Sequence, residues 1–544
     1  MSGARTLLAL SLVLIRSSAL AGGATYYLSP AGNDSDPGTT PDRPWRSFDK
    51  VLNASRPLRA ADVVVLLDGT YTPRTTGLPH VDCRAGGNAS SGAPGRPIVM
   101  RAQHERRALL QSDGSASGFT MDACSWWVVE GLRAASRDAD APQTGGYPVR
   151  LSGVDHVTLR RLLGSHNNRR QNTHVFAVED STNVLVEECE AYFFHRHAFS
   201  IWRSRFVTIR RCYANSMRYG ERGCCSTIDN RAYGDEAFSL YGTSDSIVEN
   251  SISENEANGF QIHGIANPLD PSGNGGRNNR ILGCVSLDDS VPLLVSSRMA
   301  GGAYRNAQGN EIRDFIAASM SGAGVYLRGA AGTLVEHATL YGSTGAGGLV
   351  ADGGDPGMGG SCGPSNPDGC GVTARAVLSL DHRQGHGFRV SGQDNWLIEW
   401  SNASGNRVDY APAERLDDDA GHIRHSRTLD APEMGLGDGQ CLIRVPEGSA
   451  LKHAAGGGRD IGATILDRYA DGRLTGQALW EGATGAFPCG AVVAGINDGP
   501  IRCTNVHERL HVNAHGCRLP ASAAGDARPA ADRDAGEPGS RDSR

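Results

Sequence analysis

The chain has 544 residues, with 53 Lys and Arg against 59 Asp and Glu, so its formal net charge at pH 7 is −6. This weakly acidic balance argues against a nucleic-acid-binding protein, which needs a clustered basic face. No stretch beyond the N-terminus approaches the roughly 18–20 apolar residues that a membrane-spanning helix needs. The 13 cysteines are compatible with some disulfides if the chain is exported.

The first residues predict a secretion signal over 1–21. Arg5 precedes an apolar run from Leu7 to Ile15, and the residues at 19–21 have the small-x-small pattern of a cleavage site. We therefore expect a mature protein that begins near Gly22 and is secreted, either to the cell exterior or to the periplasm.

A short apolar pattern repeats through the middle of the chain. It is clearest at 175–186 and returns at 198–209, then, after an insertion, at 237–248, and again at 259–284. Each copy holds two or three short alternating strands between Gly, Asn, Asp or Ser corners. A single copy cannot bury its apolar face, whereas stacked copies can. The repeat predicts an all-β protein, a single-stranded right-handed parallel β-helix.

Alternation along the first strand of each copy sends two columns of side chains inward. The aromatic column is Phe176, Phe199, Phe238 and Phe260, and the aliphatic column beside it is Val178, Ile201, Leu240 and Ile262. Three cysteines fall at equivalent inward positions: Cys189, Cys212 and Cys284. We expect these three to be small buried thiols and not disulfides.

The mature N-terminus carries a specific resemblance over residues 25–72. It reads YYLSPAGNDSDPG from Tyr26, then PWRSF from Pro44 and DVVVLLDGTY from Asp62. This resembles the first segment of secreted right-handed β-helix proteins related to the family-9 polysaccharide lyases, the pectin-lyase-like group. The resemblance implies an N-terminal cap with the first rungs over 22–120, followed by a central β-helix over 121–410.

Beyond the central rungs, the segment 460–469 and the stretch from Cys503 to Cys517 resemble a tail found in some of these bacterial proteins. This implies a small β-rich extension over 411–519, in which Cys503 pairs with Cys517 or, alternatively, with Cys489. Residues 520–544 are rich in Ala, Gly, Pro, Asp and Arg without an apolar period, which predicts a disordered tail.

One difference from the family limits which catalytic residues the resemblance implies for this chain. Family-9 lyases are understood to remove the C5 proton with a lysine, assisted by calcium on an aspartate cluster. The two lysines of this chain, Lys50 and Lys452, lie outside the central rungs, so the family's lysine has no counterpart. The aspartate cluster has no clean counterpart either.

The repeat itself nominates a candidate site on the outward face of the first strands, where equivalent residues stack about 4.8 Å apart. One column is Ala177, Ser200, Ser239 and Gln261; a second is Glu179, Trp202, Tyr241 and His263; a third, at the start of the strands, is His174, His197, Glu236 and Asn258. The insertion 218–235 is expected to overhang this face.

These residue types suit a lyase that acts on an acidic, uronate-containing polysaccharide by β-elimination. Such an enzyme needs a base for the proton beside the carboxylate and a positive group for the developing charge. His197 or Tyr241 is the candidate base, and Arg203, or a cation such as Ca²⁺ held by Asp235 and Glu236, is the candidate neutraliser. The candidate substrate-binding residues are Glu179, His195, Arg196, Trp202, Gln261 and His263.

Two other functions stay open. A non-catalytic glycan-binding or surface β-helix would use the same aromatic groove, and polar residues at stacked corners also hydrogen-bond one another for stability alone. A glycoside hydrolase needs two carboxylates about 5.5 Å apart for retention or 6.5–9.5 Å for inversion. Glu179 and Glu236 lie two rungs apart, on the order of 10 Å, which disfavours a retaining enzyme. In each case we expect a monomer whose partner is a polysaccharide.

Overall fold

The computed structural model describes residues 22–503 and 506, except for 115, 137–145, 169–171, 218–233, 301–302, 306, 354–370, 393–394, 414–420, 431–433, 435–441, 482–485 and 500–501. The side chains of 234–235, 298–300 and 303–305 are also outside the description. The predicted signal at 1–21, most of the insertion at 218–235 and the predicted tail at 520–544 therefore lie outside the described residues.

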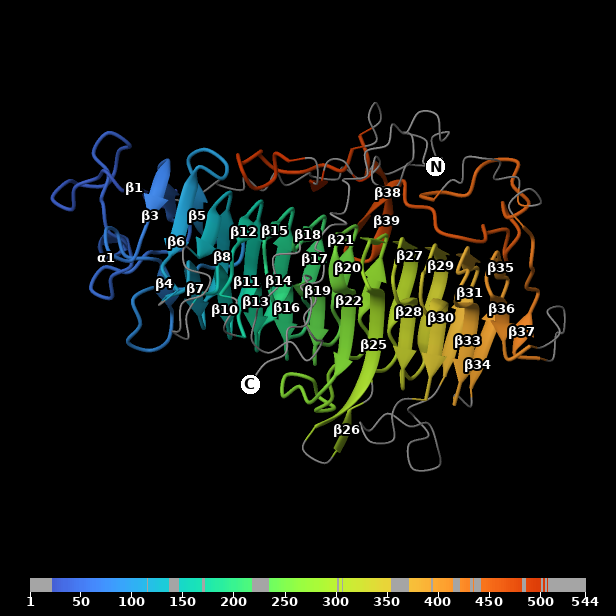
Figure 1. Ribbon diagram of the computed structural model, residues 1–544. Helices are drawn as coiled ribbons and strands as arrows, with labels where there is room; N and C mark the ends of the chain where they lie inside the picture. The colour runs from blue at the N-terminus through green and yellow to red at the C-terminus, as the bar shows by residue number, and fades with distance from the viewer. Residues whose placement is uncertain are drawn as a thin grey trace, which may run out of the picture.

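The chain winds into a coil with three strands in each central turn. One turn consists of β13 (His174–Glu179), β14 (Thr182–Glu187) and β15 (Glu190–Tyr192), and the next of β16 (His197–Trp202), β17 (Thr208–Arg210) and β18 (Tyr213–Asn215). Each strand pairs in parallel with its equivalent one turn later. Parallel crossovers of this kind are right-handed. The predicted right-handed parallel β-helix is therefore confirmed, and its strands stand side by side along one long axis (Figure 1).

The first strands of successive turns form one continuous sheet, which we call the first sheet. Its strands are β4 (His80–Asp82), β7 (Phe119–Asp122), β10 (Val149–Ser152), β13, β16, β19 (Gly234–Tyr241), β22 (Glu256–Gly264), β25 (Val291–Ala300), β28 (Ala323–Arg328), β30 (Gly347–Asp352), β33 (His386–Ser391) and β36 (Val408–Ala411). The second and third strands of the turns form the other walls of the coil.

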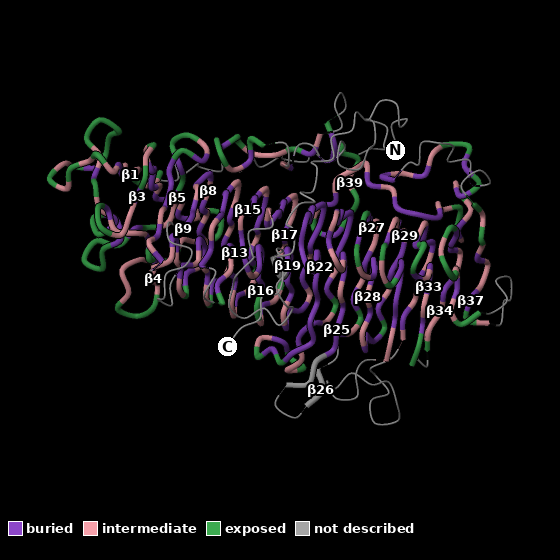
Figure 2. Tube along the Cα trace, in the orientation of Figure 1, coloured by how far each residue is buried: buried purple, intermediate pink, exposed green. Residues whose placement is uncertain are grey.

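The interior holds the two columns expected from the repeat. Phe176, Phe199, Phe238 and Phe260 stack with ring centroids 4.8, 5.0 and 4.8 Å apart and nearly parallel planes. The aliphatic column beside them is also buried, as the strands in Figure 2 show. Cys189, Cys212 and Cys284 are buried free thiols, which confirms that prediction.

The N-terminal end of the coil is covered by apolar residues of the first segment. The short helix α1 (Phe48–Val51) lies beyond β1 (Thr25–Leu28) and packs Phe48 and Val51 into the main core. Within the described part of the chain, no helix is long and apolar enough to cross a membrane.

The C-terminal extension runs back over the outside of the third strands, and its segments appear in orange and red along the coil in Figure 1. It carries the antiparallel strands β38 (Asp467–Ala470) and β39 (Arg473–Ala478). Its apolar residues, among them Trp480 and Phe487, pack on outward residues of the rungs such as Tyr192 and Tyr213. The coil therefore has one outer face covered by its own chain, while the first sheet is a different wall.

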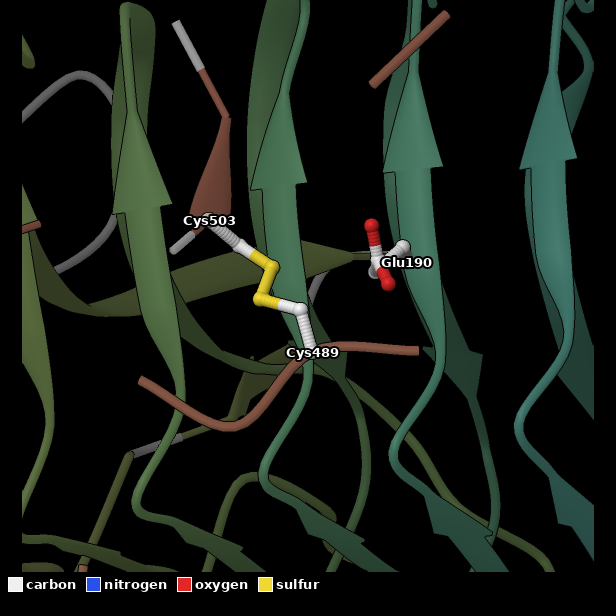
Figure 3. A group of neighbouring side chains, drawn as sticks. All are labelled: Glu190, Cys489 and Cys503. Atoms are coloured by element: carbon white, nitrogen blue, oxygen red, sulfur yellow. A yellow bond between two sulfur atoms is a disulfide. The ribbon is translucent and has the colours of Figure 1, made fainter. Parts of the chain in front are cut away.

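A disulfide joins Cys489 and Cys503 in the extension, so the pairing expected first, Cys503 with Cys517, is wrong and its alternative is right. A second disulfide joins Cys83 and Cys124 near the N-terminal end. The carboxylate of Glu190 lies beside the Cys489 and Cys503 sulfurs (Figure 3), in the one group of three metal-capable side chains found among the described residues.

This group is a structural anchor and not a metal site. The two sulfurs are already bonded to each other, and Glu190 accepts hydrogen bonds from the extension, from the backbone N–H of Gly490 and the side chain of Asn497, both at 3.1 Å. The guanidinium of Arg106, fully buried, lies 2.6 Å from the same carboxylate.

Arginine and glutamate alternate along the last outward position of the second strands, in a row that we call the charge ladder. In register, its members are Arg101, Glu130, Arg160, Glu187, Arg210, Glu249, Leu282, Arg313, Glu336, Arg375, Glu399 and Arg424. Opposite charges directly across neighbouring strands stabilise the pairing, and like charges destabilise it.

The charge ladder has one interruption, at Leu282, and the extension docks there. Glu249, whose next rung lacks an arginine, instead accepts the backbone N–H groups of Asp471 and Gly472 at 3.0 and 2.9 Å. Arg210 reaches the Asp471 carboxylate at 3.2 Å. The turn between β38 and β39 thus supplies donors where the ladder lacks a guanidinium.

Candidate functional site

The outer face of the first sheet has the register that the repeat predicts. Glu179, Trp202, Tyr241 and His263 stand opposite one another on β13, β16, β19 and β22. At the start of the same strands, His174, His197, Glu236 and Asn258 are in register.

An aromatic shelf occupies the C-terminal end of these strands. Trp202 and Tyr241 stack with ring centroids 4.8 Å apart, and the His263 ring follows at 4.6 Å from Tyr241. Trp202 is 37% exposed, whereas the phenylalanines behind it are buried. Nδ1 of the buried His263 lies 2.5 Å from the Ser296 hydroxyl on the next rung. Large rings that stack outward cover no core, so their arrangement suits the apolar face of a sugar ring better than it suits folding.

Charged side chains flank the aromatic shelf. Arg203 follows Trp202 at the corner, where its guanidinium lies 5.9 Å from the Trp202 ring and donates to Asp180 at 2.9 Å. Arg150, on β10, binds Glu179 at 2.6 Å. The shelf therefore has a partly exposed guanidinium on one side and a paired carboxylate at its N-terminal rung.

The other end of the strands carries a line of imidazoles. The His174 and His197 rings stack at 4.5 Å, and Nε2 of His197 forms an ion pair with Glu236. Tyr147 packs edge-on against His174, with ring centroids 5.8 Å apart. Burial, together with the nearby His197 and Arg196, holds the pKa of His174 well below its usual range.

The two ends do not meet. His197 and Trp202 stand at opposite ends of β16, five residues apart, or roughly 16 Å at the rise of an extended strand. The structure therefore brings Trp202, Arg203, Tyr241 and His263 together, but keeps His197 and Glu236 apart from them. A single reacting carbon cannot touch both groups.

The remaining predicted residues differ in exposure. His195, Gln261, His197 and Glu236 are buried, with 3–7% exposed, whereas Arg196 is half-buried. The backbone N–H of His195 donates to Asn167 in the preceding turn. Side chains that are almost completely covered do not present themselves to a polymer on the surface, so we leave His195, Gln261 and the equally buried His263 out of the proposed site.

Of the two predicted calcium ligands, Asp235 and Glu236, the structure describes only the Glu236 side chain, because the Asp235 side chain lies outside the described residues. The Glu236 carboxylate is engaged by His197. Calcium takes six to eight oxygen ligands, and the described surroundings of Glu236 do not supply such a set. No step below is assigned to calcium.

Later rungs of the same face carry further outward polar residues that were not predicted from the sequence. Tyr326 and Arg328 on β28, Asp352 on β30 and Arg389 on β33 continue the outward columns. These residues could have been predicted, because the copies around 324–327 and 386–390 belong to the same repeat and strand alternation gives their outward positions.

Neither a family model nor a curated protein matches this chain. Among solved structures, the A-module of mannuronan C-5 epimerase AlgE6 from Azotobacter vinelandii has a TM-score of 0.44 and 14% identity, covering 68% of this chain and 89% of that chain. Pectate lyase Pel9A has a TM-score of 0.36 and 15% identity, covering 82% of this chain and 96% of that chain. The catalytic domain of a GH87 α-1,3-glucanase in complex with nigerose has a TM-score of 0.40 and 14% identity, covering 62% and 61%.

At such identities the likeness concerns the fold alone. The β-helix is established by the strand pairing of this chain, and the architecture expected from residues 25–72 is confirmed at that level.

Proposed function

We propose that this chain is a secreted polysaccharide-active protein, and specifically a lyase that cleaves a uronate-containing polymer by β-elimination on the outer face of the first sheet. The observation that carries the proposal is the aromatic shelf with Arg203 beside it: Trp202 and Tyr241 stack outward 4.8 Å apart, and the guanidinium lies 5.9 Å from the indole. The two disulfides fit an oxidising compartment.

In this proposal a uronate ring rests on Trp202, so that the sugar is oriented before reaction. The Tyr241 phenolate takes the proton beside the carboxylate, the bond to the leaving oxygen breaks as a double bond forms within the ring, and the proton now on Tyr241 passes to the leaving oxygen. Arg203 stabilises the negative charge that develops on the carboxylate. Of the two candidate bases, Tyr241 fits better than His197, because His197 lies at the other end of β16 in an ion pair.

The test is incubation of the full chain with pectate, alginate and glycosaminoglycan, followed by the absorbance of the unsaturated product. Product from at least one uronate polymer, lost in Tyr241→Phe, supports the proposal. Absence of product from every polymer contradicts it, and new reducing ends without that absorbance indicate a hydrolase. A calcium requirement stays a prediction: dialysis against a chelator should then abolish activity, and calcium should restore it.

A glycan-binding protein without catalysis is the second candidate, and the same shelf favours it. It predicts affinity for a polysaccharide that Trp202→Ala weakens, with no product at any polymer concentration.

A further inference from the structure

Charge is distributed unevenly along the outer face of the first sheet. The N-terminal rungs carry three carboxylates, Asp82, Asp122 and Glu179, and two guanidiniums that pair with them, Arg84 and Arg150. The central rungs carry the aromatic shelf. The rungs after it carry Arg328 and Arg389, with Asp352 as the carboxylate between them.

From this polarity we infer that the face binds a carboxylate-bearing glycan in one direction, with its acid groups held on the C-terminal side of the shelf by Arg328 and Arg389. The inference rests on the proposed function in one respect, that the face with the shelf is where the glycan binds. It adds the subsite, the groups that recognise the acid, and the side of the shelf toward which the polymer extends.

The positions of the two arginines fit this role. Arg328 continues the column of Trp202, Tyr241 and His263, separated from His263 only by the rung of Ser296, and so lies roughly 14 Å from Tyr241 along the coil axis. Arg389 lies two rungs after Tyr326 in the neighbouring column. Both arginines are half-buried. A polymer that rests on the shelf and follows the coil axis passes directly over them.

Arg389 and Tyr326 differ in their local contacts. The buried Nε of Arg389 has no hydrogen-bond partner in the described part of the structure. Asp352 accepts a hydrogen bond from the Tyr326 hydroxyl at 2.6 Å. Burial and, to a smaller extent, this hydrogen bond raise the pKa of Tyr326 to about 12, so the phenol stays a donor at neutral pH. A guanidinium matches a carboxylate with two parallel hydrogen bonds, which suits an acidic sugar better than a neutral one.

The net negative charge of the chain explains why an acid-binding site must be a local region of positive charge. The whole chain has a net charge of −6, so a polyanion is repelled unless a positive region receives it. Burial and the nearby Arg389 and Arg407 lower the pKa of His386, so this imidazole is neutral at pH 7 and adds no charge. The positive charge at these rungs therefore comes from the guanidiniums, which stay ionised at every physiological pH.

The experiment measures binding directly, by affinity electrophoresis of the full chain in gels containing polygalacturonate or neutral dextran. Arg328→Ala with Arg389→Ala should weaken polygalacturonate binding about tenfold, a loss in the range of hydrogen bonds to charged groups. Most of its salt dependence should also disappear. Arg473→Ala removes an exposed guanidinium on β39 and serves as the matched control.

Glu179→Gln tests the opposite end of the face. It removes a carboxylate and releases Arg150, so polygalacturonate binding should become stronger by a few-fold. This variant also keeps the inference testable if the double arginine variant does not fold. The inference is overturned if the arginine variant binds like the Arg473→Ala control, if Glu179→Gln does not strengthen binding, or if the wild type does not prefer the acidic polymer. Binding of this kind without any unsaturated product would remove the lyase proposal and leave the acid subsite standing.

Discussion

At the scale of single residues, exposure separates the groups that contact a glycan from those that support the fold. Trp202→Ala should weaken glycan binding by about 1 kcal/mol, or roughly fivefold, because one outward stacking surface is lost. Titration calorimetry with an oligosaccharide measures it. Phe206→Ala is the matched control, since Phe206 is also an exposed ring but lies outside the first sheet, beneath Arg205. Equal losses in both variants would contradict the assignment of the shelf.

Buried carboxyl groups give a second residue-scale prediction, in which stability depends on pH. Burial raises the pKa of Asp289 to about 7, against about 3.9 in an unfolded chain. The folded state therefore binds more protons, so the stabilisation is complete below about pH 4 and is lost as pH rises through 7. Up to about 4 kcal/mol is involved, at 1.36 kcal/mol per pKa unit.

Asp289→Asn should remove this loss, because its amide oxygen can still accept from the Glu256 backbone N–H while its amide nitrogen donates to the Ser286 hydroxyl oxygen. Relative to the variant, the thermal midpoint of the wild type should fall between pH 4.5 and 7.5. Asp288→Asn, one residue away and half-buried, is the control and should follow the wild type. Parallel pH profiles of wild type and Asp289→Asn would show that Asp289 is ionised throughout.

The candidate site shows which side-chain positions could be predicted from the sequence and which could not. Stacking of Trp202 on Tyr241 followed from the repeat, because side-chain direction in a strand is fixed by alternation. The pairing of Arg150 with Glu179 and the burial of His197 did not follow. Both depend on the conformations of the long side chains over the sheet and on the segments that cover the sheet, and strand periodicity predicts neither.

At the scale of elements, the charge ladder specifies how the rungs pair. A slip by one rung would place Arg against Arg and Glu against Glu, which is unfavourable. Glu187 sits between Arg160 and Arg210 and also binds Arg211, while the adjacent Glu188 contacts Arg211 alone and is more exposed.

Glu187→Ala should therefore lower the free energy of unfolding by about 2 kcal/mol, because three partly buried guanidiniums lose the carboxylate that they share. Glu188→Ala, the matched control, should cost less than about 1 kcal/mol. Thermal unfolding followed by circular dichroism compares the two. Similar small losses in both would mean that the ladder does not stabilise the pairing.

Prediction from sequence was strongest at this scale. The columns of Phe176 and Val178 could be aligned from the sequence, since the same apolar alternation returns in the first strand of each copy and leaves few registers. The charge ladder was missed although each member is visible in the sequence, because unequal corner lengths hide which residues stand opposite one another.

At the scale of the whole molecule, the C-terminal extension acts as a strap along the third strands. It is held by carboxylates of the rungs: Glu190 binds Gly490, Glu249 binds Gly472, and Asp314 accepts the Tyr469 hydroxyl at 2.5 Å. Sequence resemblance predicted that an extension exists, but not where it docks, because its partners lie more than 150 residues away along the chain.

Trp480→Ala with Phe487→Ala should loosen the strap, since both rings pack in the apolar cluster beneath it. Limited proteolysis should then cut within the extension while the β-helix stays protected and the far-UV spectrum is unchanged. Leu474→Ala, which removes an exposed side chain of β39, should leave the pattern as in the wild type. Simultaneous loss of the coil would show that the extension and the β-helix fold as one unit.

The central claim is that an acidic glycan binds along the outer face of the first sheet. The most direct measurement is a crystal structure of the full chain with a uronate oligosaccharide. We expect a sugar ring over Trp202 and Tyr241, and the next acid groups within hydrogen-bonding distance of Arg328 or Arg389. An oligosaccharide bound on another wall of the coil, or with its acid groups toward Asp122 and Glu179, would contradict it.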